Sequence, residues 1–336
     1  MLFKRLGRTD LKVSAVGFGG IPIQKVNAED AAKVIHKAEE FGVNFIDTAR
    51  GYTVSEEFIG EALKGRRDKW IIASKSMART KDAMLGDVDI SLKNLKTDYI
   101  DLYQLHNIKE METYHQVMEE NGALAALQQA QKAGKIGHIG ITAHTMDALE
   151  LAIESGAFST IMYPYNIVEN QAEKLFERAK KLDIGVIAMK PMAGGALTDG
   201  VLAMKYILKN ENITLAIPGM ATVEELEQNC SVANGNLELS KIELETCMNI
   251  ANELGQDFCR RCGYCTPCPK GIDIPFSFIV KAYYDNYDLK DWAEGRYKAM
   301  ANHAGDCEEC GLCEQKCPYN LKIRKKIKGV KDTFGY

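Results

Sequence analysis

Eight short apolar runs rich in β-branched residues recur between Ser14 and Met220, separated by stretches of helical composition. Continuously apolar strands are buried on both faces, which is typical of a parallel sheet covered by helices. Eight such units in about 250 residues predict a (β/α)8 TIM barrel. An open, doubly wound sheet is the alternative, although no G-x-G-x-x-G follows the first run. The runs are SAVGFGG, VNFIDT, WIIASK, YIDLYQLH, IGHIGITAH, STIMYPYN, IGVIAMKP and TLAIPGM.

The segments between the runs carry helix signals. AEDAAKVIHKAEEFG has acidic residues in its first turn, glycine at its end, and one apolar stripe formed by Val34, Ile35, Ala38 and Phe41. AALQQAQKAG and QAEKLFERAKKLDIG repeat this design and predict helices that end at Gly134 and Gly185. Near the N-terminus, FKRLGRTDLKVS has a turn signal between two β-like runs, which predicts a hairpin closing the bottom of the barrel.

The cysteines are distributed unevenly. Eight of the ten follow residue 258, which predicts a barrel domain over residues 1–250 and a separate domain over 251–336. The opening MLFKRLGRTD lacks the apolar centre of a secretory leader, and no run reaches the roughly 18 residues of a membrane span. We therefore expect a cytoplasmic protein without a membrane partner, in which clustered thiols hold metal rather than form disulfides. The net charge of −4 gives no general attraction to nucleic acid.

The two cysteine runs near the C-terminus have the spacing of iron–sulfur sites. The second run reads C-x2-C-x2-C-x3-C-P, the bacterial ferredoxin pattern, and the first is one residue shorter before its last cysteine. Zinc is the alternative, because eight thiolates could hold two tetrahedral ions. The expected metal ligands are Cys259, Cys262, Cys265 and Cys268, then Cys307, Cys310, Cys313 and Cys317.

Both runs resemble the bacterial ferredoxin domain that carries two [4Fe–4S] clusters. In that domain the fourth cysteine of each run binds the other cluster. The resemblance therefore implies that Cys317 completes the cluster of the first run, and that Cys268 completes the cluster of the second.

Four ionisable residues lie at or just beyond the ends of successive predicted strands. Asp47 ends NFID, Lys75 ends WIIASK, and His106 ends YIDLYQLH, while Tyr52 lies in the loop after the first of these. Because a barrel places its chemistry at the carboxyl ends of its strands, we expect these side chains to lie together. Taken singly, an N-capping aspartate or a structural histidine would be a plainer explanation.

FIDTARGY, IIASK and LYQLH resemble the Asp-Tyr-Lys-His tetrad motifs of the aldo-keto reductase family, and the resemblance extends over about residues 3–230. It implies nicotinamide-dependent reduction of a small carbonyl substrate, or the reverse oxidation of an alcohol. Tyr52 would donate the proton. A free phenol has a pKa of about 10, which the cation of Lys75, held by Asp47, would lower. His106 would hydrogen-bond the substrate oxygen.

The loops KPMAGGALTDG and IPGMATVEELEQN follow the last two predicted strands, where barrels often bind phosphate. Their glycines would let backbone N–H groups approach a pyrophosphate. The family resemblance places NADH or NADPH against these loops. The expected cofactor-binding residues are Gly20, Asn166, Lys190, Gly194, Gly195, Gly219, Met220, Glu225, Gln228 and Asn229.

The chain departs from the family pattern at two places. The Lys and Arg with which many members grip the 2′-phosphate of NADPH correspond here to Gly219 and Glu225. An anionic Glu225 would repel a phosphate and could accept hydrogen bonds from a free ribose, which favours NADH or weak nicotinamide binding. The glutamine of the family's sixth strand corresponds to Met162.

The sequence leaves two main functions open. One is a carbonyl reductase with attached clusters. The other is an iron–sulfur electron-transfer protein in which the barrel is a docking platform for a redox partner protein; clusters as structural staples are a third option. A hydride carries two electrons whereas a [4Fe–4S] cluster usually passes one, so direct exchange needs a flavin or a radical step. No strong flavin motif is present.

Overall fold

The computed structural model describes residues 1–336, apart from the side chain of Asn234. The chain forms two compact units, one of Met1–Met192 with Asp199–Leu239 and one of Ala193–Thr198 with Ser240–Tyr336. This division lies about ten residues before the predicted boundary at residue 250, because the whole of helix α10 (Lys241–Gly255) groups with the second unit. Cysteine spacing marks ligands, and it does not mark where a domain core ends.

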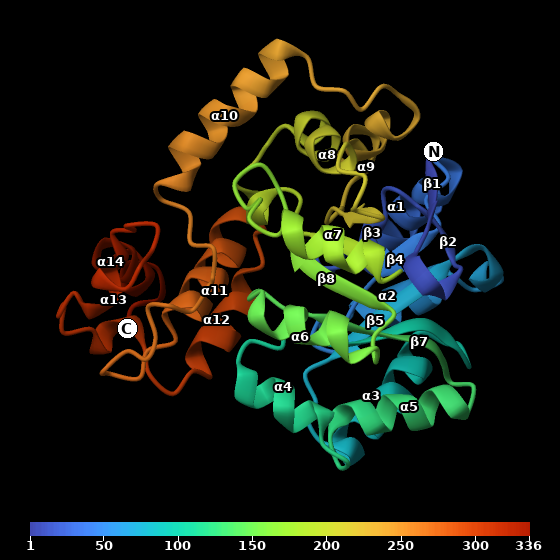
Figure 1. Cartoon of the computed structure of the whole chain (residues 1–336), viewed down its shortest axis with the longest axis horizontal. Helices are drawn as coiled ribbons and strands as arrows, with labels where there is room; N and C mark the ends of the chain where they lie inside the picture. Colours follow the sequence, from blue (N-terminus) through green and yellow to red (C-terminus); the bar gives the residue numbers. More distant parts are fainter. The chain divides into compact units, whose positions relative to one another are not determined.

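Eight parallel strands form the barrel of the first unit (Figure 1). Each strand pairs with the next one in chain order, and the parallel bridges Val16–Ala216 and Gly19–Gly219 join the last strand to the first. A doubly wound sheet would reverse its strand order at a switch point, so that alternative is wrong and the predicted TIM barrel is confirmed. The strands are β3 (Phe18–Gly19), β4 (Phe45–Asp47), β5 (Ile71–Ser76), β6 (Ile100–Leu105), β7 (Ile136–Thr142), β8 (Thr160–Pro164), β9 (Gly185–Met189) and β10 (Leu215–Ile217).

Helices follow the strands and cover the barrel. The predicted first helix begins after Asn27, whose side chain accepts a hydrogen bond from the N–H of Asp30 at 2.9 Å, and its predicted apolar stripe is buried except for the partly buried Phe41. The helices of this unit are α1 (Ala28–Glu40), α2 (Ser55–Ala62), α3 (Lys81–Asn94), α4 (Met111–Met118), α5 (Ala123–Lys132), α6 (Asp147–Ser155), α7 (Glu173–Lys181), α8 (Gly200–Leu208) and α9 (Val223–Cys230).

The expected end of one helix is wrong. α7 ends at Lys181 rather than at Gly185, and Asp183 adopts the positive φ of 55° that reverses the chain. Gly185 instead opens β9, where a Cβ would come within 2.6 Å of Cδ1 of Leu6. The glycine therefore allows close packing against the predicted N-terminal hairpin, which is present as β1 (Phe3–Arg5) paired antiparallel with β2 (Lys12–Ser14).

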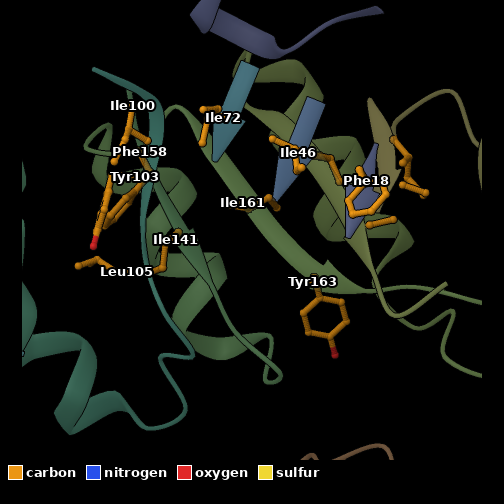
Figure 2. Close-up of a cluster of buried hydrophobic side chains, with 14 of the residues drawn as sticks. Phe18, Ile46, Ile72, Ile100, Tyr103, Leu105, Ile141, Phe158, Ile161 and Tyr163 are labelled. Atoms are coloured by element: carbon orange, nitrogen blue, oxygen red, sulfur yellow. The ribbon is translucent and has the colours of Figure 1, made fainter. Parts of the chain in front are cut away.

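Alternation along the strands decides which side chains enter the barrel. Ile46 and Tyr103 point outward into the core beneath the helices, part of which Figure 2 shows. The inward cluster includes Phe45, Ala73 and Leu102. Two residues further along the same strands, at their carboxyl ends, come Asp47, Lys75 and Gln104. The strand period thus directs three polar side chains into the mouth of the barrel.

The second unit is helical. It contains α10, α11 (Ile274–Asn286), α12 (Lys290–Lys298), α13 (Leu312–Gln315) and α14 (Ile323–Phe334). Tyr297 stacks on Phe334 with ring centroids 4.4 Å apart, and its hydroxyl accepts from the N–H of Ala304 and donates to the carbonyl oxygen of Tyr336. None of the described helices combines the length and hydrophobicity that crossing a lipid bilayer requires.

Candidate active site and cysteine centre

A buried lysine lies at the centre of the barrel mouth. Nζ of Lys75 bonds to Oδ1 of Asp47, donates to the carbonyl oxygen of Thr48 at 2.9 Å, and lies 4.8 Å from the ring centroid of Tyr52. The ring of Tyr52 meets that of His106 edge-on, with centroids 6.1 Å apart. The structure therefore brings all four predicted catalytic residues together.

Asp47 and Lys75 are only 3% and 2% exposed, so each charge depends on the other. Burial raises the pKa of Asp47, while the ammonium of Lys75 and a hydrogen bond from Gln104 oppose that rise. Nε2 of Gln104 donates to Oδ2 of Asp47 at 3.2 Å. Gln104 was not among the residues predicted from sequence, although its polar side chain lies at an inward position of the apolar run YIDLYQLH.

A second buried ion pair supports the turn that carries Tyr52. NH1 of Arg50 lies 2.7 Å from Oε2 of Glu56, which is 1% exposed, and Oγ of Ser74 donates to the other carboxylate oxygen at 2.7 Å. The N–H of Arg50 also donates to the carbonyl oxygen of Lys75 at 3.0 Å. These contacts fix the chain on either side of Tyr52 to β5. Nothing in the spacing of Arg50 and Glu56 indicated that they would meet.

The main chain around His106 is held in a similar way. Its N–H donates to the carbonyl oxygen of Ser76 at 2.9 Å. NH2 of Arg79 donates to the carbonyl oxygens of His106 and Asn107 at 2.8 and 3.0 Å. The loop after β6 is therefore clamped by an arginine from the loop after β5, and this arginine was also missed from the sequence.

In the second unit, four cysteines line one cavity. Cys259, Cys262 and Cys265 come from the first run and Cys317 from the second, and the walls between them include Phe278 and Ile323. This is the set that the crossed ligand pattern predicts for one cluster. Burial, followed by the neighbouring Cys259 and Cys262, raises the pKa of Cys265 to about 12, so a positive metal centre is needed to stabilise its thiolate.

The shared cavity of these four cysteines fits one iron–sulfur cluster. The four thiolates of a [4Fe–4S] cluster each bind a different iron atom, so they stand further apart around a larger centre than ligands of one tetrahedral ion do. Four cysteines spread around one cavity fit that requirement.

Comparison with known proteins agrees with this geometry. Residues 15–202 match the model of the aldo/keto reductase family, which is more than half of the chain. The chain belongs to the aldo/keto reductase family. Residues 258–322 match a 4Fe-4S dicluster domain. The protein is therefore an oxidoreductase of aldo-keto reductase type that also carries a dicluster domain.

Individual relatives support the assignment. L-galactose dehydrogenase of Arabidopsis thaliana is 28% identical over 295 residues, covering 72% of this chain and 91% of that protein. Aldo-keto reductase YhdN of Bacillus subtilis (strain 168) is 28% identical over 233 residues, covering 63% and 68%. The solved structure of aldo-keto reductase AKR11C1 from Bacillus halodurans shares the fold, with a TM-score of 0.64 at 24% identity over 75% of this chain and 96% of that one.

In this aldo/keto reductase, one residue expected to bind the cofactor uses its side-chain hydrogen bonds within the protein. Asn166 is fully buried, and its Nδ2 donates to Oε2 of Glu169 and to the carbonyl oxygen of Lys190, both at 3.0 Å. Its Oδ1 accepts from the N–H groups of Val168 and Glu169. Because an asparagine amide has two N–H donors and one oxygen with two lone pairs, this hydrogen-bonding capacity is used within the protein.

The acidic residue expected near the adenosine ribose forms a helix cap. Oε2 of Glu225 accepts from the N–H of Ala221 at 2.7 Å and of Thr222 at 3.2 Å, which completes a capping box at the start of α9. The carboxylate therefore already satisfies donors that an anionic ligand would otherwise use. On the same helix, the amide oxygens of Gln228 and Asn229 lie beside Gly200, within 3.0 Å of where its Cβ would be.

Three of the remaining predicted cofactor residues, Gly20, Gly219 and Met220, are closely packed. A Cβ on Gly20 would come within 2.9 Å of the carbonyl oxygen of Asp47, and one on Gly219 within 2.7 Å of Cγ of Pro22, while Met220 is fully buried. Gly194 and Gly195 have positive φ and group with the second unit. There Nδ2 of Asn286 donates to the carbonyl oxygen of Gly194 at 2.9 Å.

Proposed function

We propose that the barrel reduces a small carbonyl substrate, or oxidises the corresponding alcohol, at the site formed by Asp47, Tyr52, Lys75 and His106. The observation that carries this proposal is the position of Lys75, whose ammonium contacts Asp47 and also lies against the ring of Tyr52. A bound nicotinamide, the cofactor typical of the family, would supply the hydride.

The protein's own residues supply the proton and hold the substrate. Tyr52 donates its hydroxyl proton to the oxygen that becomes the alcohol, and the cation of Lys75 stabilises the phenolate that remains. Asp47 keeps Lys75 charged and in place inside an apolar barrel. The ring of His106, beside that of Tyr52, orients the carbonyl oxygen toward the phenol.

The variant Tyr52→Phe tests this proposal. We expect carbonyl reduction to fall by about 10²–10⁴-fold, the usual contribution of a general acid, while the dissociation constant for the nicotinamide cofactor stays within about twofold. Steady-state turnover and fluorescence titration measure the two quantities. Turnover that survives the substitution would remove Tyr52 from the chemistry.

We further propose that the enzyme prefers NADH. The carboxylate of Glu225 already accepts the N–H groups at the start of α9, so a 2′-phosphate there would face a like charge and lose those donors. Titration of wild type and Glu225→Gln with both cofactors tests this. Tighter binding of NADPH by the wild type would contradict it.

For the dicluster domain we propose two [4Fe–4S] clusters with crossed ligands. The first is held by Cys259, Cys262, Cys265 and Cys317, and the second by Cys307, Cys310, Cys313 and Cys268. Support comes from the shared cavity of the first set. Iron and sulfide analysis with a visible spectrum of anaerobically purified protein tests the metal. A zinc-loaded, colourless protein would contradict the proposal.

The same cysteine cavity supports a second function, electron transfer to or from a redox partner protein. Reduction of the anaerobic protein with NADH separates the two possibilities. Bleaching of the cluster absorption would show that electrons reach the clusters. Carbonyl turnover without bleaching would support structural clusters or a separate electron route.

A further inference from the structure

Arg79 is a half-buried cation at the mouth of the barrel with no counter-ion. It lies in the loop after β5, and it forms no ion pair in the part of the chain that the structure describes. Burial alone lowers its pKa, with no carboxylate to oppose that effect. Its NH1 is shielded from solvent and has no hydrogen-bond acceptor. A charged N–H without an acceptor is costly to bury.

Other arginines of the same barrel are neutralised. Arg50 lies 2.7 Å from Glu56, and Arg67 lies 2.6 Å from Asp101, with side chains 23% and 30% exposed. At these two positions a partly buried guanidinium is therefore paired with a carboxylate. Arg79 has no such carboxylate. Its NH2 instead donates to the carbonyl oxygens of His106 and Asn107 and contacts the sulfur of Met77.

Arg79 contacts the loop that carries a proposed catalytic residue. The carbonyl oxygens that it binds belong to the catalytic histidine and to the next residue, so the guanidinium contacts the main chain that carries His106. Its own main chain is fixed, because its carbonyl oxygen accepts from the N–H of Ala123 at 3.0 Å. The side chain as a whole is half-buried rather than enclosed, whereas NH1 is shielded from solvent, so an anion would reach NH1 through a small shift of the groups that cover it.

We propose that Arg79 binds an anionic group, a carboxylate in the first instance, on the carbonyl substrate, and so selects oxo acids over neutral aldehydes. This inference rests on the proposed function. The carbonyl would lie against Tyr52 and His106, and the carboxylate would accept hydrogen bonds from the guanidinium, which is suited to planar two-oxygen groups.

Matched aldehydes test the proposal: succinic semialdehyde against pentanal, and 4-formylbenzoate against 4-methylbenzaldehyde. We expect wild type to favour the acid by about tenfold or more in kcat/KM, the value of a charge-assisted hydrogen bond. In Arg79→Met the ratio should fall to about one, chiefly through KM. The ratio of kcat/KM for the acid to that for the neutral aldehyde is the informative quantity. Loss of the hydrogen bonds from Arg79 to the main chain at His106 would slow both substrates of a pair and leave this ratio unchanged.

Three control variants test whether the preference depends on the positive charge at position 79. Arg79→Gln keeps N–H donors for the carbonyl oxygens but not the charge, and should also lose the preference. Arg79→Lys should recover part of it. Lys93→Met removes an exposed positive charge at the far end of α3 and should keep the full ratio. A wild-type ratio near one, or an equal ratio in wild type and both uncharged variants, would overturn the proposal.

Calorimetric titration with benzoate separates this inference from the proposed function. Benzoate that binds wild type but not Arg79→Met or Arg79→Gln supports the anion site even if no aldehyde is reduced. Rapid reduction of all four aldehydes without discrimination, together with no difference in benzoate binding, would uphold the reductase and refute the role of Arg79.

Discussion

In the barrel, Asp47 and Lys75 lie on strands whose hydrogen-bond ladders fix their positions, whereas most cysteines of the second unit lie in loops between helices. The polar groups of the barrel site are bound to one another, as in the contacts of Lys75 with Asp47 and Thr48. The cysteines instead surround a cavity. Strand ladders therefore position the first site, whereas loop conformation positions the thiols of the second.

The largest expected effect comes from Lys75→Met, which removes the centre of the barrel site without removing a ladder hydrogen bond. We expect carbonyl reduction to fall by about 10²–10⁴-fold. The cluster absorption should be unchanged if the two sites are built independently. Turnover and visible spectra of the same sample measure both, and loss of the cluster signal would break the comparison.

The same variant has an expected pH dependence. Burial raises the pKa of Asp47, and removing Lys75 removes the main effect that opposes it. A carboxyl group whose folded-state pKa exceeds its unfolded value, about 3.9, gives stability that is present below that value and lost as pH rises through the folded pKa. The free energy of unfolding of Lys75→Met, relative to wild type, should therefore fall as pH rises above about 4. Lys75→Met combined with Asp47→Asn should show no such fall.

A smaller effect is expected from Gln104→Leu. It removes the second hydrogen bond to the Asp47 carboxylate but leaves the contact with Lys75. We expect about a tenfold loss in kcat, the order of one buried hydrogen bond to a charged group, with the cofactor dissociation constant unchanged. If Gln104→Leu reduces carbonyls at the wild-type rate, the inward glutamine is only a packing residue.

The smallest expected effect is a halving of the iron content, which tests which cysteines of the two runs bind the same cluster. If Cys262 and Cys317 hold the same cluster, the double variant Cys262→Ser/Cys317→Ser should retain about four iron atoms, those of the other cluster. Cys262→Ser/Cys268→Ser should lose both clusters. Iron analysis of anaerobic samples measures this, and the reverse pattern would show that each run binds its own cluster.

Much of the barrel could be predicted from sequence because its signals are local. All eight apolar runs became strands, and the polar residues at their ends met, since parallel strands in register align their carboxyl ends. The end of α7 was missed because Gly185 serves a distant contact with Leu6 rather than a helix stop. A glycine alone does not reveal which of these it serves.

Local residue patterns were enough to predict the barrel, the four catalytic candidates and the cysteine ligands, because strand period and motif spacing act over neighbouring residues. The folded structure was needed to show which distant groups complete these sites. In it, Gln104 donates a hydrogen bond to Asp47, and the side-chain amide of Asn166 bonds within its own loop. Arg79 has no carboxylate partner, and its NH1 has no acceptor. Such pairings depend on side chains from separate strands and loops meeting in a low-dielectric interior, where each donor needs an acceptor.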